Sequence, residues 1–130
     1  MPEASMAASN VSAIPAVRTF LLDLQRDMAR NNNVIMDGRD IGTVILPEAQ
    51  YKFFLTASAE VRADRRFKEL KEKGIDVDYN ALLEEIIQRD YNDSHRETAP
   101  LRQADDAILI DSSNMTLEES INAIADTVKV

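Results

Sequence analysis

The chain has 130 residues, of which 45% are hydrophobic, and a formal net charge of -8 at pH 7. This length and composition predict one compact domain rather than a disordered chain. The absence of cysteine excludes disulfides and thiolate metal sites and fits a reducing compartment, so we expect a cytoplasmic protein. No secretory leader or membrane span is expected. The negative charge opposes binding to nucleic acid and anionic membranes, so a bound phosphate must meet a local basic cluster.

The first part of the chain predicts one helix and two short strands. Apolar residues recur three or four apart over about 12–30, as in an amphipathic helix, with Pro15 in its first turn. An apolar run over 34–36 predicts a buried strand that ends abruptly in polar residues. A second strand is expected over 53–55, after the loop around Pro47.

The second part predicts a helical hairpin, a strand and a closing helix. Ser58 can cap a helix that runs to Lys73 and is stopped by Gly74, and a second helix begins near Tyr79. A third strand is expected over 108–110, and a capping box at Thr116 begins the last helix. Strands that alternate with helices predict an α/β fold with a parallel sheet, whose ligand lies beyond the carboxyl ends of the strands.

Polar side chains follow the first predicted strand at once. Asp37, Arg39 and Asp40 are adjacent to Gly42 and Thr43. An arginine can bind a phosphate through two parallel hydrogen bonds, and an aspartate can accept from a base amino group or a ribose hydroxyl. Solvated turn residues are the alternative, but loops at strand ends often carry function, which favours a binding site.

Two further clusters lie on the predicted hairpin. Arg89, Asp93 and Arg96 are spaced i, i+4 and i+7 and continue an apolar stripe, although a surface salt-bridge ladder would have the same spacing. His95 has no cysteine, histidine or carboxylate near it at the spacing of metal ligands, so we expect no metal site there.

The other cluster consists of three arginines on the first hairpin helix, at positions 62, 65 and 66. They fit a lid over a polyphosphate, or a solvated basic face that pairs with Glu69.

Three segments resemble bacterial cytidylate kinases in order and spacing: VIMDGRDIGTVILP (34–47), FLTASAEVR (54–62) and RDYNDSHR (89–96). With shorter matches on either side, the likeness covers nearly the whole chain from about Ser9. It implies a partial P-loop nucleoside monophosphate kinase fold, in a single partial domain over 1–130 with a lid hairpin at about 58–96. It also implies transfer of the γ-phosphoryl group of ATP to CMP or dCMP with Mg²⁺.

The resemblance also implies the residues of a nucleotide site. Positions that the family uses to bind substrate correspond to Ser9, Arg18 and Asp40 around the pyrimidine, Arg89 and Asp93 at the ribose, and Arg96 near the acceptor phosphate. Positions that act on phosphoryl groups correspond to Arg39 at the acceptor and to the lid arginines Arg62, Arg65 and Arg66.

The sequence departs from this family at the phosphate loop. The family opens with a strand and a glycine-rich loop that ends in Gly-Lys-Ser/Thr, whereas here no glycine precedes a lysine. No Mg²⁺ ligand is identified, and the chain resembles about the carboxyl-terminal three-fifths of the enzyme. In the sheet of this family, the first strand lies between the two strands that are expected here at 34–36 and 53–55. Without that strand, a central place in the sheet would be empty. We therefore expect self-association, rearrangement or dependence on a missing amino-terminal fragment.

Two other functions remain as alternatives. A truncated, non-catalytic module could bind nucleotide or oligomerise through its sheet edges. An aspartate-nucleophile phosphatase also places an aspartate at a strand end, but that chemistry needs carboxylates two positions apart, whereas Asp37 and Asp40 are three apart. The pair Asp105 and Asp106 precedes its strand rather than following it, which also disfavours the phosphatase.

Overall fold

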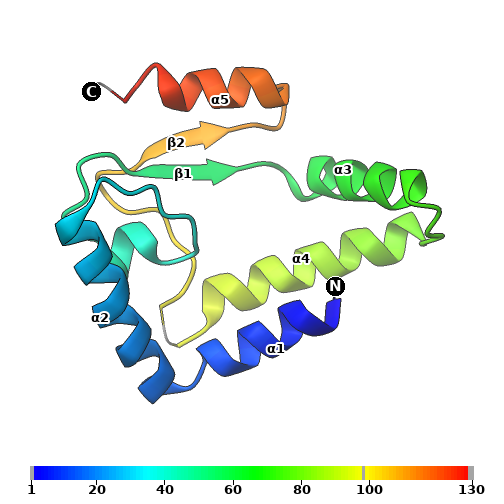
Figure 1. Cartoon of the computed structure of the whole chain (residues 1–130). Coiled ribbons are helices and arrows are strands. Elements are labelled where there is room, and N and C mark those ends of the chain that lie inside the picture. The colour runs from blue at the N-terminus through cyan, green and yellow to red at the C-terminus, as the bar shows by residue number, and fades with distance from the viewer. Residues whose placement is uncertain (1, 98, 129–130) are drawn as a thin grey trace.

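The computed structural model describes residues 2–97 and 99–128. In chain order the elements are α1 (Pro2–Ser12), α2 (Pro15–Asn31), the π-helix η1 (Ile41–Ile45), β1 (Phe53–Thr56), α3 (Ala59–Glu72), α4 (Tyr79–His95), β2 (Ile108–Asp111) and α5 (Leu117–Ala125). Figure 1 shows the two strands side by side, with α5 along β2 and the α3–α4 hairpin extending from the ends of the strands. The expected α/β class is confirmed.

The two strands are parallel and in register from Phe53 opposite Ile108 to Thr56 opposite Asp111. A buried lysine joins the segments that enter them, since Lys52 Nζ donates to Asp106 Oδ1 at 2.8 Å and also bonds the Pro47 carbonyl. The carboxyl ends of both strands therefore meet at one edge, from which α3 leaves.

The strand predicted over 34–36 is wrong, because residues 33–37 have no regular structure. A strand forms only where a neighbour takes its backbone hydrogen bonds, and within the described residues the sheet consists of β1 and β2 alone. Ile35 is fully exposed instead of buried. An apolar run was not enough to make a strand here.

The helix predicted over 12–30 is confirmed as α2, although it begins at Pro15 because a separate helix, α1, ends at Ser12. Ile14 has extended backbone angles (φ -76°, ψ 120°), as a residue before proline prefers, and Pro15 occupies the first turn of α2. The amino-terminal helix α1 was not expected from the sequence.

The helical hairpin is confirmed, and local contacts explain its ends. The Ser58 side chain accepts from the Val61 amide at the start of α3, and the Asp78 side chain caps α4 in the same way. Gly74 has a positive φ of 74° in the turn, which suits a residue without a side chain. An edge-to-face contact between Phe67 and Tyr79, with ring centres 5.8 Å apart, joins the two helices near this turn.

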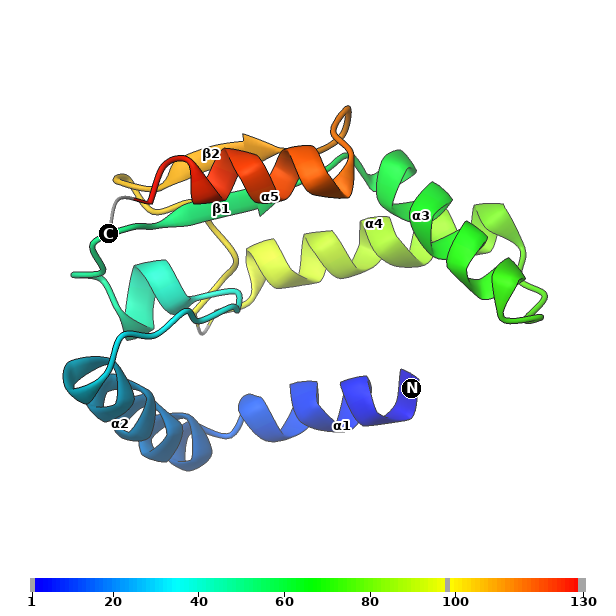
Figure 2. The same cartoon turned by 45° about the horizontal axis from the view of Figure 1, so that its top comes forward.

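The described residues bury few apolar side chains. The buried hydrophobic residues are Ile45, Ala57, Ala63 and Ile110. The accessible surface is 9924 Å², compared with about 6,900 Å² for a compact monomer of this mass. In Figure 2, α1 and α2 lie apart from the sheet and the hairpin, in an open arrangement. Apolar surface on α2, the sheet and α5 is therefore left exposed.

None of the helices in the described part of the chain combines the length and hydrophobicity that a bilayer span would need.

Candidate functional site

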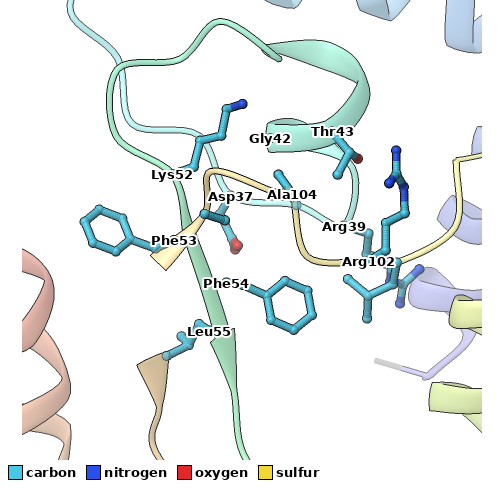
Figure 3. A pocket seen from close by; sticks show the side chains of 13 residues that line it. Asp37, Arg39, Gly42, Thr43, Lys52, Phe53, Phe54, Leu55, Arg102 and Ala104 are labelled. Carbon is cyan, nitrogen blue, oxygen red and sulfur yellow. The ribbon is translucent and has the colours of Figure 1, made fainter. Parts of the chain in front are cut away.

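A pocket of about 130 Å³ lies where the loop after α2, the strand β1 and the segment before β2 come together (Figure 3). Its lining includes Asp37, Arg39, Thr43, Phe54 and Arg102. In Figure 3, Arg39 and Arg102 lie on the same side of the pocket, next to the ring of Phe54. We call this hollow the Arg39 pocket. It joins cationic groups to an apolar wall, as a site for an aromatic anion requires.

Arg39 forms an ion pair with Asp93 of α4, with 3.1 Å between Nε and Oδ2. The side chains are 33% and 16% exposed, so the pair is partly shielded from solvent. The Asp93 carbonyl also accepts from the Leu101 amide at 2.7 Å, which fixes the chain beyond α4. Two clusters that are more than fifty residues apart in the sequence therefore meet in the structure.

A second ion pair joins the neighbouring residue Asp40 to Arg18 of α2. Asp40 is buried, and its carbonyl accepts from the amides of Val44 and Ile45 at the start of η1. Arg18 also donates to the Ser12 carbonyl at the end of α1, at 3.4 Å. This pair connects α1, α2 and the loop that carries Arg39.

Arg26 of α2, which sequence reasoning missed, holds the other end of η1. Its guanidinium donates to the carbonyls of Val44 and Ile45, each at 2.9 Å. These are carbonyls that the end of a helix leaves without an internal partner. Neither this role nor that of Lys52 has a local sequence signal, because both depend on segments folded against each other.

A larger hollow of about 410 Å³ lies at the carboxyl ends of the strands. Its polar lining consists of Arg62, Arg65, Asp90, Ser94, Thr56 and Ser112. We call it the arginine pocket. It brings together two of the predicted lid arginines.

The three predicted lid arginines have different surroundings. Arg62 pairs with Asp90 of α4, which raises the pKa of Arg62 through the hydrogen bond, against a smaller opposing effect of burial. Arg65 Nη2 donates to the Ser112 carbonyl just after β2, at 2.7 Å. Arg66 instead pairs with Glu69 at 3.0 Å on the exposed side of α3, so the solvated-face interpretation applies to it.

The remaining predicted residues lie at the margins. Ser9 on α1 and Arg89 on α4 are both exposed, and neither lines a pocket described above. Arg96 is half-buried in the extended residue that ends α4, so the helical spacing stops one residue before it. His95 stacks on Tyr91, with ring centres 4.0 Å apart, and its Nδ1 lies 2.8 Å from the Tyr91 carbonyl.

No group of three or more metal-ligating side chains occurs within 2–97 and 99–128. Several acidic residues near the sites are engaged with arginines or hydroxyls. For example, the Ser113 hydroxyl and amide donate to Asp111 and lower its pKa. Mg²⁺ in phosphoryl-transfer sites is usually held by one or two carboxylates together with substrate phosphates, so this finding concerns only a cage built from the described side chains.

A parallel two-stranded sheet with flanking helices defines an α/β protein. The family model described as "Cytidylate kinase" matches residues 1–130, and the chain belongs to this family. The resemblance inferred from the sequence is thereby confirmed.

Curated relatives agree with this assignment. The chain is 59% identical to a cytidylate kinase of Caldicellulosiruptor saccharolyticus over 125 residues, which cover 96% of this chain and 55% of that protein. It is 53% identical to one of Clostridium botulinum over 99% of this chain and 59% of the relative. For one of Clostridium tetani the identity is 52%, over 98% and 57% respectively. The chain thus spans a little over half the length of these relatives.

Proposed function

We propose that this chain forms the monophosphate-binding side and the lid hairpin of a kinase that transfers the γ-phosphoryl group of ATP to CMP or dCMP. The observation that carries the proposal is the pair of adjacent ion pairs, Arg39 with Asp93 and Arg18 with Asp40, beside one small pocket. The name of the relatives, cytidylate kinase, supports the choice of nucleotide.

Arg39 is the proposed ligand of the acceptor phosphate. Its Nε edge faces Asp93, so its two terminal nitrogens can bind two phosphate oxygens in parallel. Asp93 holds the guanidinium in place, and a second cation, Arg102, lines the same pocket. Arg96 is proposed to add charge near this phosphate.

The base is proposed to lie toward Asp40 and Arg18. A carboxylate can accept a hydrogen bond from the amino group of cytosine, which uracil lacks, and the ion pair with Arg18 orients this carboxylate. Ser9 is proposed at the pyrimidine, and Arg89 with Asp93 at the ribose. Because Ser9 and Arg89 line neither pocket, these contacts need the ligand to extend toward α1 and α4.

The lid arginines are proposed to stabilise the transferring phosphoryl group. Arg62 and Arg65 already lie at the carboxyl ends of the strands, whereas Arg66 would have to exchange Glu69 for the ligand. Catalysis of this kind consists of positioning and charge stabilisation, without a covalent intermediate. ATP and Mg²⁺ enter as co-substrates, and we derive no step through the metal.

A second candidate is a non-catalytic nucleotide-binding or self-associating module. The large accessible surface of 9924 Å² and the exposed apolar faces favour association with another polypeptide. This candidate shares the CMP site but predicts no turnover.

Calorimetric titration with CMP and with cytidine tests the proposed site. CMP should bind at least about ten-fold more tightly than cytidine, because a charged hydrogen bond to the phosphate contributes about 1.5 to 3 kcal/mol. Equal affinity for the two ligands would show that Arg39 does not anchor a phosphate.

A further inference from the structure

Arg62 is held by three hydrogen bonds that fix both the position and the plane of its guanidinium group. Nη1 donates to Asp90 Oδ1 at 2.8 Å, and Nη2 bonds Asp90 Oδ2, so the carboxylate is bound by both terminal nitrogens. Nε donates to the Ala57 carbonyl at 3.0 Å, just after β1. A guanidinium has five N–H groups, so one on each terminal nitrogen remains for another partner.

The pair between Arg62 and Asp90 adds little to stability, because its side chains are 38% and 40% exposed. Its clear physical effect is on geometry. A free arginine side chain samples many rotamers, whereas this one is ordered before any ligand arrives.

The surroundings of this guanidinium suit an anion. Arg62 and Asp90 line the arginine pocket, together with Arg65 from the next turn of α3. Arg65 is itself anchored at the other strand, by its bond to the Ser112 carbonyl. Two arginines are thus fixed at the ends of β1 and β2, with one carboxylate between α3 and α4.

We propose that Asp90 is a positioning residue, which orients Arg62 so that one of its remaining N–H groups donates to an oxygen of a phosphoryl chain in the arginine pocket. This inference rests on the proposed function, since it assigns the pocket to the phosphoryl groups being transferred. Asp90 touches no ligand in this role and acts only through Arg62.

The change in anion affinity when Asp90 is replaced separates a positioning role from a purely electrostatic one, because the two predict changes of opposite sign. Asp90 carries a negative charge, so Coulomb's law alone predicts that removing this charge strengthens the binding of an anion. If Asp90 instead orders Arg62, its replacement weakens binding, because the ligand must then order the arginine itself.

The experiment measures the affinity of the full chain for inorganic triphosphate by calorimetry, in Asp90→Asn, Arg62→Ala and the double variant. Asp90→Asn should weaken binding about two- to ten-fold, the range expected for ordering one long side chain. This loss should disappear in the Arg62→Ala background, and Asp90→Glu should recover part of it. Thermal melting of each variant checks that the fold is retained.

Glu69→Gln is the matched control, because it removes a carboxylate from another arginine of α3, Arg66, outside the arginine pocket. It should leave triphosphate affinity unchanged or raise it slightly. Unchanged or tighter binding by Asp90→Asn would overturn the proposal, as would absence of triphosphate binding by the parent chain. Failure of CMP binding would instead count against the proposed function, because CMP is assigned to the Arg39 pocket.

Discussion

Replacement of Arg39 by alanine removes the proposed anchor of the acceptor phosphate. The change deletes hydrogen bonds between a guanidinium and a phosphate, which contribute about 1.5 to 3 kcal/mol, or roughly ten- to a hundred-fold in affinity for CMP. The structure favours the upper part of this range. Asp93, whose side chain is 16% exposed, would lose its partner and would then repel the phosphate.

Calorimetry with CMP measures this loss, with two further variants for comparison. Arg39→Lys keeps the charge but not the planar pair of donors, so its affinity should lie between those of the parent and Arg39→Ala. Arg30→Ala is the matched control, because Arg30 also pairs with an aspartate, Asp27 at 3.0 Å, but is exposed on α2. Affinity that is the same in Arg39→Ala as in the parent would refute the assignment of this residue.

Three other predictions concern stability and assembly. Arg18→Met leaves the buried Asp40 carboxylate unpaired and should lower the free energy of unfolding in urea by about 2 to 4 kcal/mol, whereas adding Asp40→Asn should recover much of the loss. Lys52 lowers the pKa of Asp106 below 3.8, so this carboxylate stabilises the fold above that pH and ceases to do so as the pH falls through the lowered value. Asp106→Asn should therefore destabilise the chain at about pH 7, and this effect should shrink progressively as the pH falls below 3.8; an effect that does not change with pH would contradict the assignment. Light scattering should show self-association of the isolated chain, because of its exposed apolar surface, and a stable monomer with a cooperative melt would argue against this.

The elements that were predicted correctly are those with signals inside a few residues. The caps at Ser58 and Thr116 and the glycine at 74 mark helix ends through contacts three or four residues away. Such contacts do not depend on the rest of the fold. The α3–α4 hairpin and α5 could therefore be located from the sequence.

The errors and omissions involve long-range contacts. The run at 34–36 has the composition of a strand but no described strand beside it, so tertiary context overrides its local preference. Arg26 and Asp90 act on groups eighteen or more residues away, and nothing in their immediate neighbours distinguishes them from surface charges. The resemblance supplied Arg39 and Asp93 separately, and only the structure shows that they form a pair.

The most direct test of the account is titration of this purified chain with CMP, and separately with ATP and Mg²⁺, alongside a coupled kinase assay on the same sample. The account predicts that CMP binds and that its affinity falls in Arg39→Ala. CMP binding without turnover would identify a monophosphate-binding half-site, whereas turnover would contradict the inference that this chain lacks a phosphate loop for ATP. Absence of CMP binding by the folded chain would contradict the central claim that the Arg39 pocket holds a nucleoside monophosphate.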